Sequence, residues 1–466
     1  MALLQANTEG GPVEGLPAGN QSITVFKGIP FAAPPTGALR WRVPQPVRPW
    51  TGVRKCWQFA PIAMQERFAS EGGGIAAQDF YVRNFETSED CLALNIWTPA
   101  ESADEKLPVA VYIHGGGHTT GYSYLNCYDG EGFAKRGIIM VTIPYRLNVF
   151  GYLAHPLLRE EEGGVSGNFG IRDQIAALAW IRRNIAAFGG DPDCISIFGQ
   201  SGGASSVQYL CSTPRAQGLF RRAVMQSGGG LRAPYNMWSE SLEMAEKLGT
   251  AFFEYARFAD LAAARACPAD RLLALYAGFC TQKLDEREQP GLMKKGSYMR
   301  FTPCVDSDIF PESPVSYCLH GRHPELSYML GSTAGEGRGT TIANMAWAEN
   351  ELLLHRSPSY LYYFTYVPPG ADRAHHSVEH HYVFQTLLRS HRRYGGFDFE
   401  LSNELADAWA AFFRTGNPNP QGSSAWQPYT QANRKVWEIG STRQMAAAPL
   451  SGEEWTEVGK LLKPGN

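Results

Sequence analysis

The stretch ISIFGQSGGASSV, residues 195–207, decides how this sequence folds. It opens with an apolar, β-branched and aromatic run typical of a buried strand, and it ends in small residues typical of a closely packed helix. Between the two stands Gly199-Gln200-Ser201-Gly202-Gly203, a G-x-S-x-G. On a sharp turn from strand to helix, small flanking residues leave the serine Oγ clear of the backbone. The alternative is a Gly/Ser-rich turn without chemistry, so the rest of the chain has to support the serine.

Apolar runs on both sides of this motif alternate with helical patterns. Six apolar residues between 170 and 189 recur at spacings of three and four, which predicts one face of a helix that Gly189-Gly190 ends. Strands alternating with amphipathic helices predict an α/β fold whose central, mostly parallel sheet is flanked by helices. The helical face consists of Ile171, Ile175, Leu178, Ile181, Ile185 and Phe188. The further runs that predict buried strands are 109–116, 138–146, 222–229, 326–334 and 359–367.

The 466 residues show no repeat and no linker, so we expect one domain over 1–466. Within it, 232–320 is predicted to be a mainly helical, cap-like insertion, because its first part is rich in Ala, Leu, Glu and Arg and has few strand signals. A further helix is expected within 401–420, where Gly416 ends it.

The composition excludes several classes of function. The net charge of −3 and the lack of a long basic run give no electrostatic footprint for nucleic acid, and no apolar run is long enough to span a membrane. Nine scattered cysteines without a C-x-x-C pair argue against a disulfide framework and a zinc ribbon. Because we also see no signal peptide, unpaired cysteines favour the cytoplasm. The sequence carries no readable signal for the oligomeric state.

Two further motifs provide what a nucleophilic serine needs. His114-Gly115-Gly116-Gly117 follows a predicted strand, and glycines leave backbone N–H groups unobstructed for an oxyanion. By itself this motif could equally be a flexible loop, but upstream of a G-x-S-x-G it has the hydrolase arrangement. Downstream, the strand 326–334 leads into Gly335-Glu336-Gly337, which places an acid at a strand end. An acid followed by a histidine completes the order serine, acid, histidine.

The stretch HHSVEHHYVF, residues 375–384, supplies histidines for this last position and also suggests an alternative. His376 to His380 reads H-x-x-E-H, the helical zinc signature of inverzincin peptidases. A zinc site, however, would leave the HGGG, the G-x-S-x-G and Glu336 without a role. We therefore keep a zinc hydrolase as the least favoured hypothesis.

Taken together, these motifs resemble the type-B carboxylesterases, the family of the cholinesterases and bacterial para-nitrobenzyl esterases. The likeness extends over nearly the whole chain and implies the α/β-hydrolase fold. It is carried by GPVEGL, by 25–53 (VFKGIPFAAPPTGALRWRVPQPVRPWTGV), by 89–99 (EDCLALNIWTP), by 168–192, and by FGQSGGASS, AVMQSGG, GSTAGEG and HSVEHHYVF.

The resemblance implies a role for each matching residue. Ser201 matches the nucleophile, Glu336 the acid and His376 the base, while His375 would break the register by one. The oxyanion donors would be the N–H groups of Gly116, Gly117 and Gly202, and Ser227 matches a serine that supports the triad. The implied reaction is hydrolysis of small to medium carboxylic esters through an acyl-enzyme, with no metal and no organic cofactor. A small-molecule ester is then the expected partner, and a catalytically silent adhesion-type relative is the main alternative.

This chain departs from the family pattern at four points. Gln200 replaces a glutamate before the nucleophile, which removes a negative charge near the imidazole. Gly202 replaces an alanine and retains the N–H donor. Cys91 matches a half-cystine whose partner position falls near Ala63, so we expect a free, buried thiol. The segment 337–375 is short, which predicts a more open cleft. His118, after the glycines, is expected to pack over the loop rather than to touch substrate.

Overall fold

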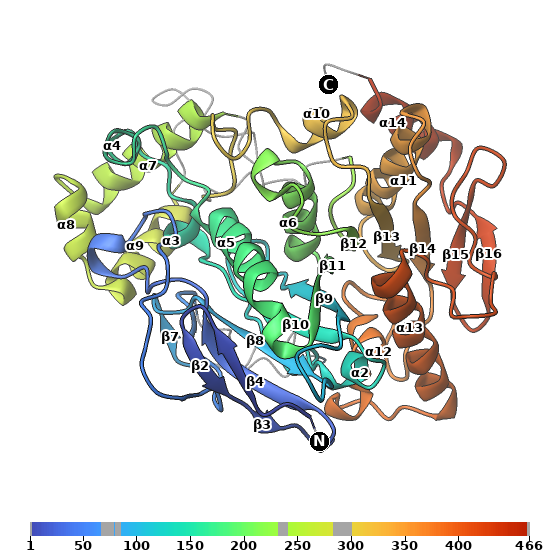
Figure 1. Cartoon of the computed structure of the whole chain (residues 1–466). Coiled ribbons are helices and arrows are strands. Elements are labelled where there is room, and N and C mark those ends of the chain that lie inside the picture. Colours follow the sequence, from blue (N-terminus) through green and yellow to red (C-terminus); the bar gives the residue numbers. More distant parts are fainter. Residues whose placement is uncertain (1, 67–78, 80–84, 232–240, 283–300, 464–466) are drawn as a thin grey trace.

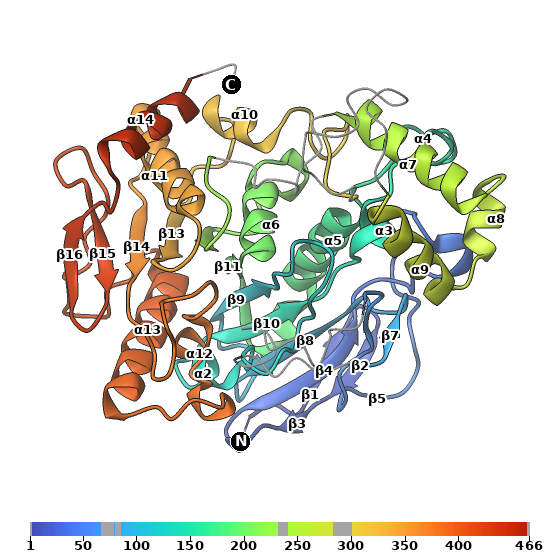
Figure 2. The ribbon, with the colours of Figure 1, turned by 180° about the vertical axis from the view of Figure 1, so that it is seen from behind.

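The computed structural model describes residues 2–66, 79, 85–231, 241–282 and 301–463. Its centre is an 11-stranded sheet in the order β16-β15-β14-β13-β12-β11-β9-β10-β8-β4-β3. Neighbouring strands are parallel from β10 through to β15 and antiparallel toward both edges. The mostly parallel sheet predicted from the sequence is therefore confirmed. Figures 1 and 2 show β15 and β16 at one edge and the N-terminal strands β3 and β4 at the other.

All six runs expected to be buried strands are strands of this sheet. They correspond to β9 (Leu107–Ile113), β10 (Ile139–Ile143), β11 (Gly190–Gln200), β12 (Arg222–Gln226), β13 (Ser327–Thr333) and β14 (Tyr360–Phe364). The remaining strands of the sheet are β3 (Leu16–Pro17), β4 (Thr24–Pro30), β8 (Ala93–Thr98), β15 (Lys435–Ile439) and β16 (Arg443–Ala447). Two small sheets lie outside it and consist of β1 (Gln5–Thr8), β2 (Gly11–Glu14) and β5 (Arg54–Lys55), and of β6 (Ile62–Ala63) and β7 (Thr87–Ser88).

Helices cover both faces of the large sheet because alternate residues of each strand point to opposite sides. In β11, Ile195 and Ile197 pack toward α5 (Phe169–Asn184) and α6 (Gly202–Cys211), whereas Phe198 packs toward α13 (Gly396–Thr415). The first face is also covered by α11 (Arg338–Leu353), and the second by α2 (Glu131–Ala134) and α12 (His380–Val383). Figure 1 shows α5 and α6 in front of the central strands.

The helices expected from the sequence are present with nearly the predicted ends. The six-residue apolar face lies on α5 and the 3₁₀ helix η2 (Ile185–Phe188), which Gly189 ends at φ +80°. Gly416 ends α13 in the same left-handed conformation. A positive φ of this kind favours glycine, which has no Cβ to clash with the backbone. The remaining short elements are α3 (Asn148–Tyr152), α4 (Pro156–Glu161), α14 (Gly452–Leu461), η1 (Gly37–Leu39), η3 (Pro214–Ala216) and η4 (Leu387–Arg389).

The range 232–320 carries helices and lacks strands in the residues that are described there. Three of its helices pack with α3 in a separate apolar cluster that contains Trp41 and Phe252. Residues 232–240 and 283–300 lie outside the described residues. The helices are α7 (Leu242–Ala256), α8 (Leu261–Ala266), α9 (Ala269–Cys280) and α10 (Pro314–Leu319).

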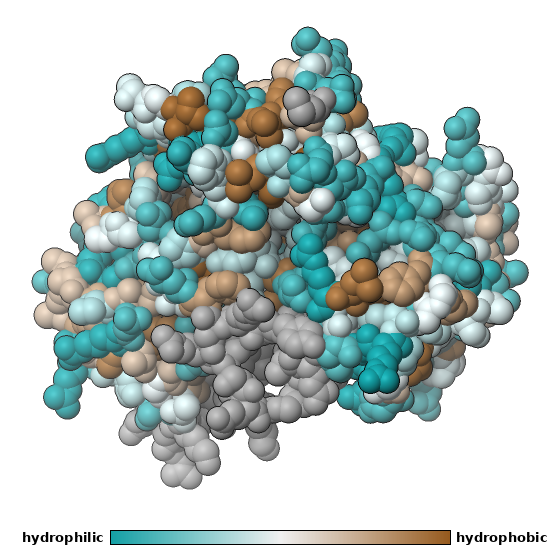
Figure 3. Space-filling view, turned by 90° about the horizontal axis from the view of Figure 1, so that it is seen from below, coloured by the Kyte–Doolittle hydropathy of each residue, from teal (hydrophilic) through white to brown (hydrophobic). Residues whose placement is uncertain are grey.

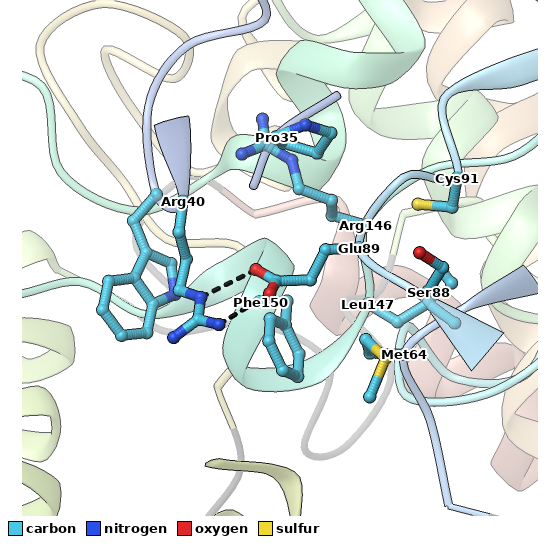
Figure 4. A pocket seen from close by; sticks show the side chains of 11 residues that line it. Pro35, Arg40, Met64, Ser88, Glu89, Cys91, Arg146, Leu147 and Phe150 are labelled. Atoms are coloured by element: carbon cyan, nitrogen blue, oxygen red, sulfur yellow. Dashed lines mark hydrogen bonds and ion pairs between the residues drawn. The ribbon is translucent and has the colours of Figure 1, made fainter. Parts of the chain in front are cut away.

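Cys91 is a free, buried thiol, as expected. Its side chain lines a small cavity together with Ala63 and with the ion-paired Arg40 and Glu89, whose atoms approach to 2.6 Å (Figure 4). Burial raises the pKa of the Cys91 thiol well above its ordinary value. Ala63 carries no sulfur, so it cannot form a disulfide with Cys91.

The surface seen from below is mainly hydrophilic, with apolar residues in separate small patches (Figure 3). A groove of about 400 Å³ elsewhere in the fold is lined by Phe85, Tyr122, Tyr124, Asn126, Leu388, Arg389 and Ser390. In the part of the chain that the structure describes, no helix has both the length and the apolar character needed to cross a membrane.

Candidate active site

The predicted catalytic residues gather where four parallel strands end. The HGGG loop follows β9, Ser201 follows β11, Ser227 follows β12, and Glu336 lies just beyond β13. Because parallel strands point the same way, their carboxyl ends meet at one edge of the sheet, where α/β proteins place their sites. Residues that are far apart in the sequence thus lie on neighbouring strands.

Ser201 stands on a strained turn between β11 and α6, as the G-x-S-x-G predicts. Its backbone has φ +56° and ψ −123°, a combination that a non-glycine residue rarely adopts. The turn is held because the Ser201 N–H donates to the Gln226 carbonyl at 2.9 Å. A Cβ at Gly199 would come within 2.5 Å of Gly203, and a Cβ at Gly203 would overlap the Ile113 carbonyl oxygen. The glycines of the motif are thus required by packing.

Glu336 and His376, which the sequence predicts as acid and base, are in direct contact. His376 Nδ1 lies 2.5 Å from Glu336 Oε2, and the carboxylate is 5% exposed. The other oxygen of Glu336 accepts a hydrogen bond from the Thr333 N–H at 2.9 Å, which fixes the direction of the carboxylate. Desolvation alone would lower the pKa of His376, but the hydrogen bond and charge of Glu336, with the charge of Glu379, raise the pKa above its ordinary value of 6.5.

The second ring nitrogen of His376, Nε2, is in contact with the side chain of Gln200. The Gln200 side-chain amide nitrogen lies 3.0 Å from His376 Nε2. Among the described residues, Ser201 Oγ has no hydrogen bond with His376. The structure therefore brings the three expected residues to one site, with the amide of Gln200 on the nitrogen that would accept the serine proton.

The glycines expected to bind an oxyanion surround the same turn. Gly116 and Gly117 have positive φ angles of 104° and 60°, and a Cβ at Gly116 would overlap the Thr120 carbonyl. In the part of the chain described, the N–H groups of Gly116 and Gly117 have no hydrogen-bond acceptor. Gly202 begins α6, so its N–H has no intrahelical acceptor either. A Cβ added to Gly202 would lie 2.8 Å from Gly117 N, which shows how closely the loop and the helix approach.

His118 is packed behind this loop, as expected. Its side chain is fully buried, its Nε2 lies 3.0 Å from Ser206 Oγ on α6, and its ring stacks on Tyr209 with centroids 5.8 Å apart. Burial, aided by His114, lowers the pKa of His118 to about 3, so the ring is neutral at ordinary pH. His118 thus ties the HGGG loop to α6 and does not face solvent.

The structure adds a buried acid that sequence reasoning gave no role. Glu379 is 1% exposed, and its Oε1 lies 3.5 Å from both Ser227 Oγ and Tyr362 Oη. Burial and the nearby charge of Glu336 raise the pKa of Glu379 to about 7. Ser227 thus contacts Glu379 rather than Glu336. The only sequence signal was the position of Glu379, three residues after His376.

The other histidines of HHSVEHH are committed to contacts inside the fold. His380 is bonded through Nε2 to Tyr112 Oη at 2.8 Å and through Nδ1 to the Ser377 carbonyl at 2.9 Å. His376 faces Glu336 and Gln200 instead of sharing a face with His380. Because a zinc ligand needs a free ring nitrogen directed at the metal, this geometry does not favour the zinc interpretation.

Known proteins resemble this chain over nearly its full length. Fumonisin B1 esterase of Sphingopyxis macrogoltabida is 31% identical, over 94% of this chain and 86% of that protein. Phenmedipham hydrolase of Pseudarthrobacter oxydans is 30% identical, over 94% and 95%. Among solved structures, a PNB esterase has a TM-score of 0.81 at 27% identity over 99% of both chains. A carboxylesterase of Geobacillus stearothermophilus has a TM-score of 0.76 at 30% identity, over 97% of this chain and 99% of that one.

These structures confirm the α/β-hydrolase fold. The model of the Carboxylesterase family matches residues 3–352 and 340–455, and the two ranges overlap within α11, between Glu336 and His376. With such a match and with relatives at 30% identity or more along nearly its whole length, the chain belongs to the carboxylesterase family and is a carboxylic-ester hydrolase.

Proposed function

We propose that this esterase cleaves small to medium carboxylic esters through a covalent acyl-enzyme on Ser201. The observation that carries the proposal is the strained serine turn at the strand edge where Glu336 Oε2 lies 2.5 Å from His376 Nδ1. A nucleophile, an oriented base and unpaired N–H groups in one place are the parts that acyl transfer needs.

The proposed first half of the reaction transfers the acyl group. His376 Nε2 accepts the proton of Ser201 while Oγ bonds to the ester carbonyl carbon, and Glu336 stabilises the resulting imidazolium. The N–H groups of Gly116, Gly117 and Gly202 bind the oxyanion, and loss of one such donor typically lowers turnover by about 10²–10³-fold. The tetrahedral intermediate then expels the alcohol, which takes the proton from His376. In the second half, water attacks the acyl-enzyme with His376 again as the base.

The proposal extends to Ser227 and Glu379 as supports of the pair. A carboxyl group whose pKa is about 7 is largely protonated below neutral pH, so Glu379 can accept the hydrogen bonds of Ser227 and Tyr362 without adding a second full charge beside Glu336. Its contacts with Ser227 and Tyr362 would hold the segment that carries His376.

We propose that the substrate range depends on the segments that surround this site. The segment 337–375 forms α11 and β14, and its shortness supports a more open cleft than in longer relatives. The relatives are named for fumonisin B1 and for phenmedipham, two different small molecules. We further propose that helices α7 to α10 act as a cap-like insertion in a single domain. The nine free cysteines support a reducing compartment such as the cytoplasm.

The test is hydrolysis of short-chain p-nitrophenyl esters by the wild-type protein and by Ser201→Ala. We expect the variant to lose at least about 10³-fold in turnover, because the nucleophile is gone. An organophosphate should titrate wild-type activity one to one, while a chelator should leave it unchanged. Equal rates for the two proteins would overturn the proposal. A wild-type protein without turnover on a panel of acyl lengths would favour a silent relative.

A further inference from the structure

The nitrogen that should accept the serine proton is already hydrogen-bonded in the resting site. Glu336, when ionised, can only accept hydrogen bonds, so His376 Nδ1 carries the proton of the neutral ring and Nε2 carries the lone pair. The amide nitrogen of Gln200, 3.0 Å away, can only donate. The contact is thus an N–H donor of Gln200 on the lone pair of the base.

Gln200 is held in this position by the sheet. It is the last residue of β11, it is 3% exposed, and it pairs in register with Gln226 of β12. The HGGG loop also presses against its backbone, since a Cβ at Gly115 would lie 2.7 Å from the Gln200 carbonyl oxygen. The strand therefore delivers the nucleophile and, one residue earlier, a donor aimed at the base.

We propose that Gln200 is a positioning residue that caps His376 Nε2 in the resting enzyme and favours the neutral imidazole. The inference rests on the proposed role of His376 as the base. A donor on the lone pair stabilises the neutral ring and is incompatible with a proton on that nitrogen. Ser201 must displace the amide from Nε2 before it transfers its proton. The amide of Gln200 thus keeps the ring neutral and oriented in the resting enzyme, and it leaves Nε2 when substrate binds.

The other titratable groups near this imidazole either favour its protonation or are paired with a different residue. Glu336 after β13 and Glu379 on the same segment favour the imidazolium. His375, the preceding residue, is paired with Asp79 at 2.6 Å. Gln200 is thus the one contact of His376, within the described residues, that opposes protonation through a hydrogen bond. A glutamate here would add an acceptor and a third carboxyl group, with the reverse effect.

The experiment compares wild type with Gln200→Glu and Gln200→Asn on a p-nitrophenyl ester, as the pH profile of kcat/KM. The glutamate has the same length but accepts where the amide donates. The asparagine keeps the amide but is one methylene too short to reach Nε2. On the acid side of the profile, kcat/KM falls as the base becomes protonated, and this acid limb gives the apparent pKa of the base. We expect this pKa to be lowest in wild type, about half a pH unit higher in Gln200→Asn, and about one unit or more higher in Gln200→Glu. In Gln200→Asn, water can take the place of the amide next to Nε2. Because water can donate or accept a hydrogen bond, it no longer favours the neutral ring, but it does not favour the protonated ring either.

A second measurement keeps the test independent of product release. The pH dependence of inactivation by a small organophosphate reports the same base in a single chemical step, and it should show the same order. Identical acid limbs in wild type and Gln200→Asn would overturn the cap, and so would a Gln200→Glu limb at or below that of wild type. Failure of the proposed function looks different, because Ser201→Ala would then hydrolyse the ester as fast as wild type.

Discussion

At the scale of single residues, contacts separate one histidine from three similar neighbours. His376 reaches Glu336 and Gln200, whereas His375 bonds through Nδ1 to the His376 carbonyl at 2.9 Å and pairs with Asp79. The four histidines within residues 375–381 thus have different contacts, because the chain turns between residues 375 and 380 and then enters α12. Position in the sequence alone does not show which ring meets Glu336 and Gln200.

This difference gives a paired prediction. His376→Ala should lower turnover at least about 10³-fold, because it removes the proposed base. His375→Ala should leave most of the turnover at moderate temperature, since its ring contacts Asp79 rather than the reacting atoms. The measurement is kcat/KM of both purified variants, together with their melting temperatures. The reverse pattern would move the catalytic histidine by one position.

The sequence could single out Ser201, Glu336 and His376 as candidates because each lies in a motif with fixed neighbours. It could not show that Gln200 donates to His376 or that Ser227 meets Glu379. Those contacts depend on side-chain directions across separate strands, which spacing along one strand does not encode. Gln200 was recognised as a lost charge, but its role as a donor became visible only with its partner.

At the scale of elements, the site depends on how closely the oxyanion loop approaches α6. Ser206 on α6 meets His118 on the loop at 3.0 Å, and Gly202 leaves no side chain between the two backbones. Family members that carry alanine after the serine need more space there. In this chain the loop lies where that methyl group would be.

Gly202→Ala should therefore lower activity although alanine is common in the family. The new Cβ would stand 2.8 Å from Gly117 N and 3.1 Å from Gly117 Cα, so the loop must shift by a few tenths of an ångström. Because oxyanion donors act only over a narrow distance range, we expect kcat to fall by about 10-fold or more with little change in KM.

The matched control is Gly337→Ala, at a glycine beside Glu336 where an added Cβ meets no atom within 4 Å. Both variants should be compared by steady-state kinetics on the same ester. If Gly202→Ala retained the wild-type kcat, the loop could accommodate the added methyl group, and the close approach of Gly202 to Gly117 would not limit activity.

The elements themselves were largely predictable, apart from the edges of the sheet. Central parallel strands such as β9 and β10 are almost continuous apolar runs, since both of their faces are covered, and such runs stand out in a sequence. The last two strands toward one edge, β15 and β16, were not predicted. They are short and partly exposed, and RQMAA in β16 shows no clear alternation. Pairing with a neighbour, rather than their own composition, makes them strands.

At the scale of the whole molecule, one buried carboxylate joins distant parts of the chain. Asp79 pairs with His375 at 2.6 Å and with Arg392 at 2.9 Å, and its side chain is 4% exposed. Its carbonyl oxygen also lies 2.8 Å from His381 Nε2. The segment that carries His376, the proposed base, is thus attached to a residue about three hundred positions earlier, a link that no local sequence pattern could predict.

Asp79→Asn should destabilise the fold in a pH-dependent way. Burial opposes ionisation, but the hydrogen bonds and charges of His375 and Arg392 lower the pKa of Asp79 from 3.8 to about 2. A carboxyl group with a lowered pKa in the folded state contributes stability that is present above pH 3.8 and is lost as pH falls through 2. We expect the variant to lose about 2–4 kcal/mol of unfolding free energy at pH 7, because Arg392 and His375 stay buried without their partner. This difference should shrink as the pH approaches 2.

Urea unfolding of wild type and variant across this pH range measures the effect, and an exposed ion pair provides the control. Asp407 lies 2.5 Å from Arg136, but its side chain is 51% exposed, so Asp407→Asn should cost less than about 1 kcal/mol at any pH. Solvent screens the exposed pair, whereas the buried carboxylate of Asp79 is the shared partner of Arg392 and His375. Equal losses for the two variants would mean that Asp79 contributes no more than a surface charge, and the attachment of the catalytic segment would have to come from apolar packing alone.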